Sequence, residues 1–552
     1  MNHRDCVIDL SHCVLPTRLL DVMTDNPRLI TLNKAINELK VLPTRPTYLA
    51  LSHCWGKDGV PLKTTKETVG KFEQSIPFED LPRTFREAVI ITRKLNVRYL
   101  WIDSLCIIQD DSADWEREAA KMADIFRSAH ITLAASSAEG CHDGCFESQP
   151  ATPASRFYLP NNTDNVCGGV IYVQDVFQQE TSHITVLNQS PMHKRGWILQ
   201  ETLLSRRILH LTKGQFYWQC NSLLESEDQI LSHTCEADLS RLLGEGERPS
   251  QYWRQKNILL SNTPLSSFRP GSNPNDQAHR WWSLMEEYSS RSLTFPEDFL
   301  PALAGLVALY QRLMGDESVV GLWKNNLAIH LSWRQGYFLN WSAKEVDDQQ
   351  PSWSWTKIVP FWRDPPNKFQ TSGTLHFPEY DHMPFGNDGF QVIWKADIQD
   401  VEVSWEGLPI VSKLSRAELK VASIDWPNRE VDEFMWSVIV PRAQCTLSRH
   451  KHHSYFDLEK HRNLYAKGGL ESLRAIEILL WIGFDHTGDK WGSYFRHCSM
   501  LLIPKDGSQQ SCVYRRIGIA EGEWACTRDD RTEAENFILS RLQGFDTAVR
   551  LI

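Results

Sequence analysis

The sequence predicts an α/β fold in the N-terminal part of the chain, then a helical middle segment and a β-rich C-terminal domain. Short apolar runs alternate with amphipathic helical patterns between Pro46 and Cys220. Helical patterns dominate from Glu236 to Trp333, and short β-like runs separated by turns follow from about Gln349. Strands that alternate with helices favour a parallel sheet that is covered on both faces.

The chain length supports a division into several parts. With 552 residues the chain is longer than one hydrophobic core usually serves. Its 41% hydrophobic and 23% charged residues are typical of folded globular proteins. We therefore predict an N-terminal segment over 1–45, an α/β domain over 46–230, a helical segment over 231–345 and a β-rich domain over 346–552. The clearest helix of the middle segment is expected over 300–314.

The α/β domain owes each of its predicted elements to a local pattern. Apolar, β-branched and aromatic runs predict strands, and apolar residues at helical spacing predict helices. Pro82 suits a first helical turn, and a turn at Lys213-Gly214 suits a hairpin. The expected strands are 47–54, 97–103, 131–138 and 183–189, the helices are 81–96, 112–129 and 194–207, and the hairpin is 207–220.

Charge and cysteine content exclude several classes of protein. The net charge is -10 with a pI of about 6.0, and no long basic stripe indicates nucleic-acid binding. No apolar run reaches the roughly 18 residues of a membrane span, and the N-terminus lacks the apolar stretch of a secretory signal. Thirteen scattered cysteines favour free thiols in a reducing compartment. We expect a cytoplasmic protein that binds neither nucleic acid nor membrane.

Polar and aromatic residues gather where the first two predicted strands end. In parallel sheets, ligands bind at the carboxyl ends of strands. Trp55 could stack on a flat ring or belong to the core, and Asp103 could bind a sugar hydroxyl or fix its own loop. The candidate binding residues are Ser52, His53, Trp55 and Gly56 at the end of the first strand, and Asp103, Ser104 and Cys106 at the end of the second.

Other kinds of chemistry find less support. A thiol nucleophile at Cys54 or Cys106 would need His53 as its base, but neighbouring strand residues point to opposite faces, so His53 does not suit Cys54. The cluster between Cys141 and Cys145 lacks a second pair at zinc spacing. Phosphate-binding and dinucleotide-binding glycine motifs are absent from the sequence. We expect no metal and no resident cofactor.

Three blocks resemble, in their order and spacing, the motifs of the heterokaryon incompatibility (HET) family. They are YLALSHCWG at 48–56, LPRTFREAVIITRKLNVRYLWIDSLCIIQDD at 81–111 running on into a helix, and RGWILQETLLSRRILHL at 195–211. Two residues depart from the family pattern: Ile108 stands where Asn is usual and Phe126 where Tyr is common. The loss of the Asn amide predicts one fewer polar contact near the end of the second strand.

The resemblance also implies a relation to TIR domains, which are flavodoxin-like α/β modules. Trp197 and Glu201 lie four apart on one face of a predicted helix, similar to the TIR helix whose Glu is catalytic in members that cleave NAD. Nicotinamide leaves NAD as a neutral ring, so one carboxylate that stabilises the cationic sugar suffices. The resemblance implies Glu201 and Asp103 as catalytic residues, with Trp197 beside the substrate. The alternative is a structural Glu201 paired with Arg195, Arg206 or a backbone amide.

Three functions follow from this resemblance. The first is a fungal cell-death effector of non-self recognition, an innate-immunity role, with NAD as substrate. The second is a non-enzymatic signalling module with protein partners or self-association, and the third is a fold recruited for a small-molecule metabolic reaction. NAD cleavage requires Glu201 in a cleft with Asp103 and Trp55 nearby. A module without activity would bury Glu201 in a salt bridge and expose an apolar patch.

Overall fold

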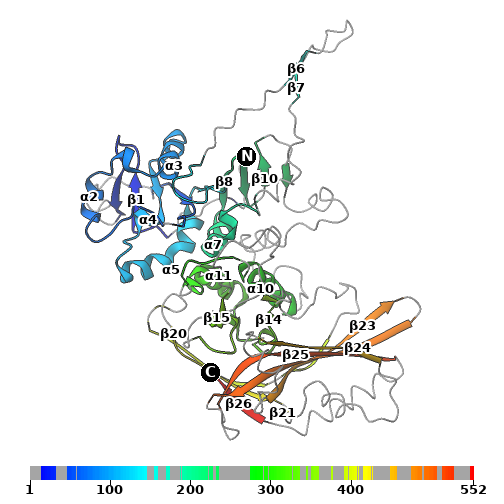
Figure 1. Cartoon of the computed structure of the whole chain (residues 1–552). Coiled ribbons are helices and arrows are strands. Elements are labelled where there is room, and N and C mark those ends of the chain that lie inside the picture. The colour runs from blue at the N-terminus through cyan, green and yellow to red at the C-terminus, as the bar shows by residue number, and fades with distance from the viewer. Residues whose placement is uncertain are drawn as a thin grey trace. The chain divides into compact units, whose positions relative to one another are not determined.

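A computed structural model shows two compact units, Met1–Asn262 and Thr263–Ile552, each of which is described by itself (Figure 1). In the first unit the structure describes residues 6, 14–32, 46–57, 59–145, 155–158, 170–173, 187, 189–221, 223–227 and 232–234. In the second it describes 274–289, 291–295, 298–325, 327–335, 344–345, 350–359, 375–376, 391–395, 397–406, 408, 414–423, 425–426, 448–456, 474–487, 490–505, 513–527 and 547–552.

A mixed sheet forms the centre of the first unit. Its order is β11-β10-β9-β8-β5-β3-β4-β1-β2. The four inner strands β8, β5, β3 and β4 are parallel, and the strands on both sides pair antiparallel. The strands are β1 (Arg18–Asp21), β2 (Arg28–Thr31), β3 (Tyr48–Ser52), β4 (Tyr99–Trp101), β5 (Ile131–Ala134), β8 (Arg207–Leu211), β9 (Phe216–Cys220), β10 (Leu223–Ser226) and β11 (Ser232–Thr234), with a separate hairpin of β6 (Ser155–Tyr158) and β7 (Val170–Val173).

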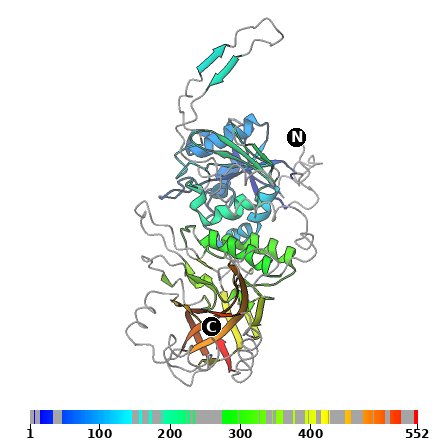
Figure 2. The ribbon, with the colours of Figure 1, turned by 90° about the vertical axis from the view of Figure 1, so that its right-hand side faces the viewer.

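Helices cover both faces of this sheet. The chain passes from β3 to β4 in one direction and then back across β3 to β5, so right-handed crossovers place the connecting helices on opposite faces. In Figure 2, α3 lies on one side of the sheet, with α5 and α7 together on the other. The helices of this unit are α2 (Val69–Gln74), η3 (Phe78–Asp80), α3 (Arg83–Lys94), α4 (Asp103–Cys106), α5 (Ser112–Ser128), η4 (Met192–Lys194) and α7 (Gly196–Leu204).

The predicted α/β architecture is confirmed, with one correction. The sheet is not parallel throughout, because β1 and β2 from the N-terminal segment and the strands after β8 extend it antiparallel. The expected helices and the hairpin at 207–220 lie within one to three residues of their predicted bounds. The predicted strand over 183–189 falls largely outside the described residues, and its Leu187 is helical.

The core of the first unit follows from local burial patterns. Strand β3 is buried at all five positions, as expected for a central strand with helices on both faces. On α3, Phe85, Ala88, Val89 and Thr92 form the buried face, and α5 presents Met122, Ile125 and Phe126 in the same way. The side chain of Asp111 caps α5 by accepting the backbone N–H groups of two first-turn residues.

The second unit combines helices with a separate β-rich sheet, as predicted. Its large sheet has the order β18-β23-β24-β25-β26-β20-β19, with β21 on β23 and β22 on β25. Within this unit, Arg516 donates to the carbonyls of Leu331 and Trp333 and stacks over the Trp333 ring. The helical residues near 330 and the sheet therefore share one core. Whether the boundaries predicted at 230 and 345 separate domains stays a prediction.

Helices and strands of the second unit have the following bounds. The helices are α10 (Pro274–Ser289), η7 (Pro301–Leu303), α11 (Ala304–Met314), α12 (Leu327–His330) and η8 (Trp355–Lys357). The strands are β12 (Ser318–Val319), β13 (Leu322–Trp323), β14 (Arg334–Gln335), β15 (Lys344–Glu345), β16 (Ile358–Val359), β17 (Leu375–His376), β18 (Gln391–Lys395), β19 (Asp397–Trp405), β20 (Leu414–Ser423), β21 (Asp425–Trp426), β22 (Ser448–Phe456), β23 (Arg474–Thr487), β24 (Lys490–Pro504), β25 (Val513–Thr527) and β26 (Thr547–Leu551). Among the helices that the structure describes, none combines the length and apolarity of a membrane span.

Candidate functional site

The candidate site lies at the carboxyl end of β3. The chain passes from β3 to β4 on one side of β3, and then from β4 to β5 on the other side. The strand order therefore reverses between β3 and β5, and open α/β sheets bind ligands at such a point. Ser52 ends β3, Asp103 opens the α4 turn just after β4, and Glu201 lies on α7 before β8. Three separate β–α connections thus bring these side chains to one edge of the sheet.

Glu201 pairs with a neutral partner. The Ser52 hydroxyl donates to Glu201 Oε2 at 2.5 Å, and Glu201 is only 7% exposed. Burial raises the pKa of Glu201 to about 7, and nearby Asp103 raises it as well; the Ser52 hydrogen bond and the charge of Arg195 act in the opposite direction without cancelling the effect. A carboxyl group with a pKa near neutrality can change its charge under physiological conditions.

Asp103 is held by neutral donors in the same way. The indole N–H of Trp55 donates to Asp103 Oδ2 at 2.8 Å, and the Ser104 backbone N–H donates to Oδ1 at 2.6 Å. The side chain of Asp103 keeps 24% of its surface exposed, so a ligand can reach it. Trp55 is half-buried against the core, and its bond to Asp103 fixes the orientation of its ring.

His53 is a buried neutral imidazole. Burial lowers the pKa of His53 to about 4, and the positive charge of Arg195 lowers it further. The negative charge of Asp103 raises this pKa but does not outweigh burial. Its Nδ1 lies 3.9 Å from Asp103 Oδ1, which is too long for a hydrogen bond, and its ring packs edge-on against Phe85. Nε2 is buried without a hydrogen-bond partner in the described structure. Such orphaned groups are uncommon in folded proteins.

Arg195 fixes the start of α7 against the loop after β3. Its guanidinium donates to the His53 carbonyl at 2.6 Å. Glu201 accepts its described hydrogen bond from Ser52, and the charge of Arg195 lowers the pKa of Glu201, so the alternative of a structural Glu201 paired with Arg195 or Arg206 stays a prediction. This contact joins two blocks of sequence that lie 142 residues apart.

Two glycines let the loops after β3 and β5 approach closely. Gly56 has φ +84°, and a Cβ there would lie 3.3 Å from the Cα of Gly140. A side chain at either position would push the loops apart, and at Gly56 it would also be strained. Gly56 was predicted, but Gly140 was missed; its position shortly after the third strand was the only sequence signal for it.

The thiols and Trp197 do not contribute to the paired groups. Burial raises the pKa of Cys54 and raises that of Cys106 to about 12, so neither forms a thiolate near neutral pH. Trp197 packs edge-on against Trp115 of α5. Ser104 is fully buried, and its hydroxyl lacks a hydrogen-bond partner in the described structure. Among the predicted residues, the structure thus joins Ser52 with Glu201 and Trp55 with Asp103.

The loop that contains Ile108 is held by hydrogen bonds although Ile108 has no polar side chain. Its backbone N–H donates to Asp114 Oδ2 at 2.9 Å, and the neighbouring Gln109 amide reaches the carbonyls of Asp103 and Ile107. The main chain therefore anchors this loop whatever the side chain at position 108.

The exposure predicted for an active Glu201 is not observed. The structure shows Glu201 near Asp103 but nearly inaccessible, while the salt bridge expected of a purely structural acid is also absent from its described contacts. Glu201 is therefore covered while Asp103 is partly exposed, and both carboxyl groups accept bonds from neutral hydrogen-bond donors.

Residues 48–201 match the model of the family described as heterokaryon incompatibility protein (HET). The chain therefore contains a HET domain, and the match supports a function related to heterokaryon incompatibility. Neither the curated proteins nor the solved structures that were searched include a match to the chain.

Proposed function

We propose that this chain is a cell-death effector of non-self recognition whose HET domain cleaves NAD between nicotinamide and ribose. The observation that carries the proposal is Glu201: a buried carboxyl group at the carboxyl end of β3, bonded to the Ser52 hydroxyl and close enough to Asp103 for the two charges to interact. A TIR-like, flavodoxin-like origin of the domain and a fungal source belong to the same proposal.

The chemistry requires little besides a placed carboxylate. The bond between ribose C1′ and the nicotinamide nitrogen breaks, and its electron pair leaves with nicotinamide, which becomes neutral. The sugar left behind is an oxocarbenium-like cation, which the Glu201 carboxylate would stabilise electrostatically. Water then attacks C1′ and releases a proton to solvent, so that the products are nicotinamide, ADP-ribose and H⁺.

Asp103 and Trp55 would bind the substrate in this reaction. Asp103 keeps part of its carboxylate exposed and can accept a ribose hydroxyl. Trp55 offers an indole ring whose direction is set by its bond to Asp103 and which can stack on a flat base. Because Glu201 is covered in the described state, cleavage needs a movement of α7, and self-association or a protein partner would supply it.

Nicotinamide release by the purified full chain at high protein concentration tests the proposal. We expect release by the wild type and at least a hundredfold loss in Glu201→Gln, which keeps the shape of the side chain but removes its charge. Glu79→Gln, at a side chain that is 84% exposed, is the matched control and should keep full activity. Release that persists in Glu201→Gln would contradict the proposed role of Glu201.

The pH dependence provides a second check on the same residue. Glu201 stabilises the cation only when it is ionised, and its pKa lies at about 7. The rate should therefore rise from pH 6 to pH 8 and level off above. A rate that falls over this range would assign the essential group to an acid instead.

A second candidate is a signalling module without enzymatic activity, which the burial of Glu201 favours. Expression of the chain in fungal cells separates the two. If Glu201→Gln abolishes cell death together with NAD loss, the enzymatic proposal holds. If the variant still kills the cells and cellular NAD does not fall, the signalling module is the better account.

A further inference from the structure

The α4 turn, which begins with Asp103, is held by hydrogen bonds from outside the turn. The last carbonyls of any helix lack partners within it, and a helix of four residues satisfies almost none itself. Here the carbonyl of Asp103 accepts the Ile107 backbone N–H at 3.0 Å and the Gln109 side-chain amide at 3.2 Å. The next three carbonyls are bonded by residues from other elements.

Thr64, in the segment that follows β3, supplies two of these bonds. Its backbone N–H donates to the Ser104 carbonyl at 2.9 Å, and its hydroxyl donates to the Leu105 carbonyl at 2.6 Å. Its own carbonyl accepts the Gln109 backbone N–H at 2.8 Å. Thr64 is fully buried, so no water competes for these bonds.

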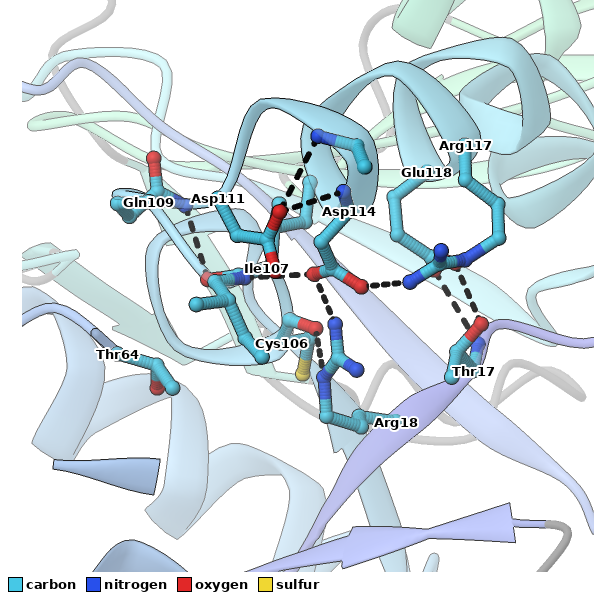
Figure 3. Close-up of polar contacts among 12 residues, drawn as sticks. Thr17, Arg18, Thr64, Cys106, Ile107, Gln109, Asp111, Asp114, Arg117 and Glu118 are labelled. Carbon is cyan, nitrogen blue, oxygen red and sulfur yellow. Dashed lines mark hydrogen bonds and ion pairs between the residues drawn. The ribbon is translucent and has the colours of Figure 1, made fainter. Parts of the chain in front are cut away.

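Arg18, from β1, holds the end of the turn. Its Nε donates to the Cys106 carbonyl at 2.8 Å, and its Nη2 pairs with the Asp114 carboxylate (Figure 3). Asp114 in turn accepts the Ile108 backbone N–H at 2.9 Å. One buried guanidinium therefore joins β1, the turn after β4 and the first turn of α5.

A second contact keeps β1 in place beside α5. The Thr17 hydroxyl donates to Glu118 Oε1 at 2.5 Å, and its backbone N–H reaches Oε2 at 3.2 Å. Lys121 Nζ lies 2.9 Å from the Thr17 hydroxyl and 3.0 Å from Glu118 Oε1. Arg18 is thus carried by a strand that is itself fixed to α5.

We infer that Thr64 and Arg18 are positioning residues, which hold the α4 turn so that Asp103 meets the Trp55 indole and faces the site. The inference rests on the proposed function in so far as Asp103 binds the substrate. A small displacement of a binding group reduces a rate strongly, which gives a reason for such multiple anchoring. Arg18 lies before residues 48–201, so the site is incomplete without β1.

Thr64→Val tests the inference in the full chain, because it removes one hydroxyl with little change of shape. Thr92→Val is the matched control: Thr92 is equally buried, and its hydroxyl also donates to a backbone carbonyl, that of Ala88 at 2.7 Å, but within α3. The readout is the NMR signal of the Trp55 indole N–H, assigned through Trp55→Phe. A bond to a carboxylate shifts such a signal, so the signal reports the Trp55–Asp103 contact directly.

We expect Thr64→Val to move the Trp55 signal and Thr92→Val to leave it in place. Thr64→Ser, which restores the hydroxyl, should return it to the wild-type position. An unchanged Trp55 signal in a folded Thr64→Val protein would overturn the inference. Arg18→Lys keeps the charge beside Asp114 but loses the forked geometry, and it should move the same signal.

Nicotinamide release in the same variants separates this inference from the proposed function. If the wild type is active, Thr64→Val should lower kcat about tenfold while Thr92→Val lowers it less than twofold. If the wild type is inactive but the Trp55 signal moves as expected, the positioning role stands and NAD cleavage does not. If Thr64→Val keeps full kcat although the signal moves, the turn does not position a catalytic group, and the inference fails.

Discussion

Two pairs of carboxyl groups lie in the HET-containing unit, and they differ in their partners. Asp114 and Glu118 on α5 are surrounded by cations, namely Arg18, Arg117 and Lys121. Glu201 and Asp103 instead accept hydrogen bonds from a hydroxyl, an indole and a backbone amide. Burial alone would raise the pKa of Asp114, but Arg18 and the Ile108 N–H outweigh it and lower the pKa. At Glu201 burial prevails and the pKa rises.

The difference distinguishes the structural role of Asp114 from the chemical role proposed for Glu201. A carboxylate fixed by cations stays ionised and holds elements together, as Asp114 does between β1 and α5. A carboxyl group buried beside neutral donors stores unfavourable energy when ionised, and a ligand that becomes positively charged can relieve it. Three changes would break or sharpen this contrast.

Arg18→Met should have the largest effect. It leaves Asp114 ionised and buried, at 2% exposure. The cation that still pairs with Asp114 is then Arg117, whose side chain is more exposed. We expect a loss of about 3–5 kcal/mol of stability in this unit. Native-state hydrogen exchange of the buried amides of β3 and β5 measures it.

The double variant Arg18→Met/Asp114→Leu is the control for this change, because it removes both charges. It should recover most of the lost stability. If the single variant lost less than about 1 kcal/mol, the pair would be no stronger than an exposed one, and the structural role of this cluster would be wrong.

Glu201→Gln should stabilise the same unit, with a pH dependence of defined sign. The folded-state pKa of about 7 exceeds the ordinary value of 4.5 for Glu, so the folded state binds more protons between these pH values and loses stability as pH rises. Gln does not ionise. The variant should gain up to about 3 kcal/mol over wild type at pH 8 and little at pH 4.

Unfolding free energies of both proteins from pH 4 to pH 8 provide the check. If the stability gained by Glu201→Gln over wild type increased toward acidic pH, or if the variant gained none, Glu201 would be stably ionised like Asp114. The contrast between the two groups of carboxylates would then disappear.

Lys121→Met should have the smallest effect. The Lys121 side chain is 30% exposed, and Glu118 keeps its bonds to Thr17 without it. We expect a loss of no more than about 1 kcal/mol, as for partly exposed ion pairs, and less at high salt. A loss comparable to that of Arg18→Met would show that Glu118 depends on a full set of cations.

Much of the first unit could be predicted from the sequence because its patterns are local. The periodicity of apolar residues in 81–96 and 112–129 reports which face of each helix is buried, and it located α3 and α5 well. The apolar run around 48–52 located β3, and the polar residues at the strand ends could be placed at one edge of the sheet. These local patterns gave the α/β class and the general place of the site.

What the tertiary structure decided are the partners of these residues. Ser52 and Glu201 are 149 residues apart, and Arg18 lies 96 residues from Asp114. Whether a carboxyl group meets a hydroxyl or a guanidinium depends on which strands become neighbours, and no local period encodes that order. The antiparallel edge strands, the orphaned Nε2 of His53 and the burial of Glu201 follow from the same long-range pairing. The sequence alone determined which residues could act, while the packing of distant strands determined their charge and their access to a ligand.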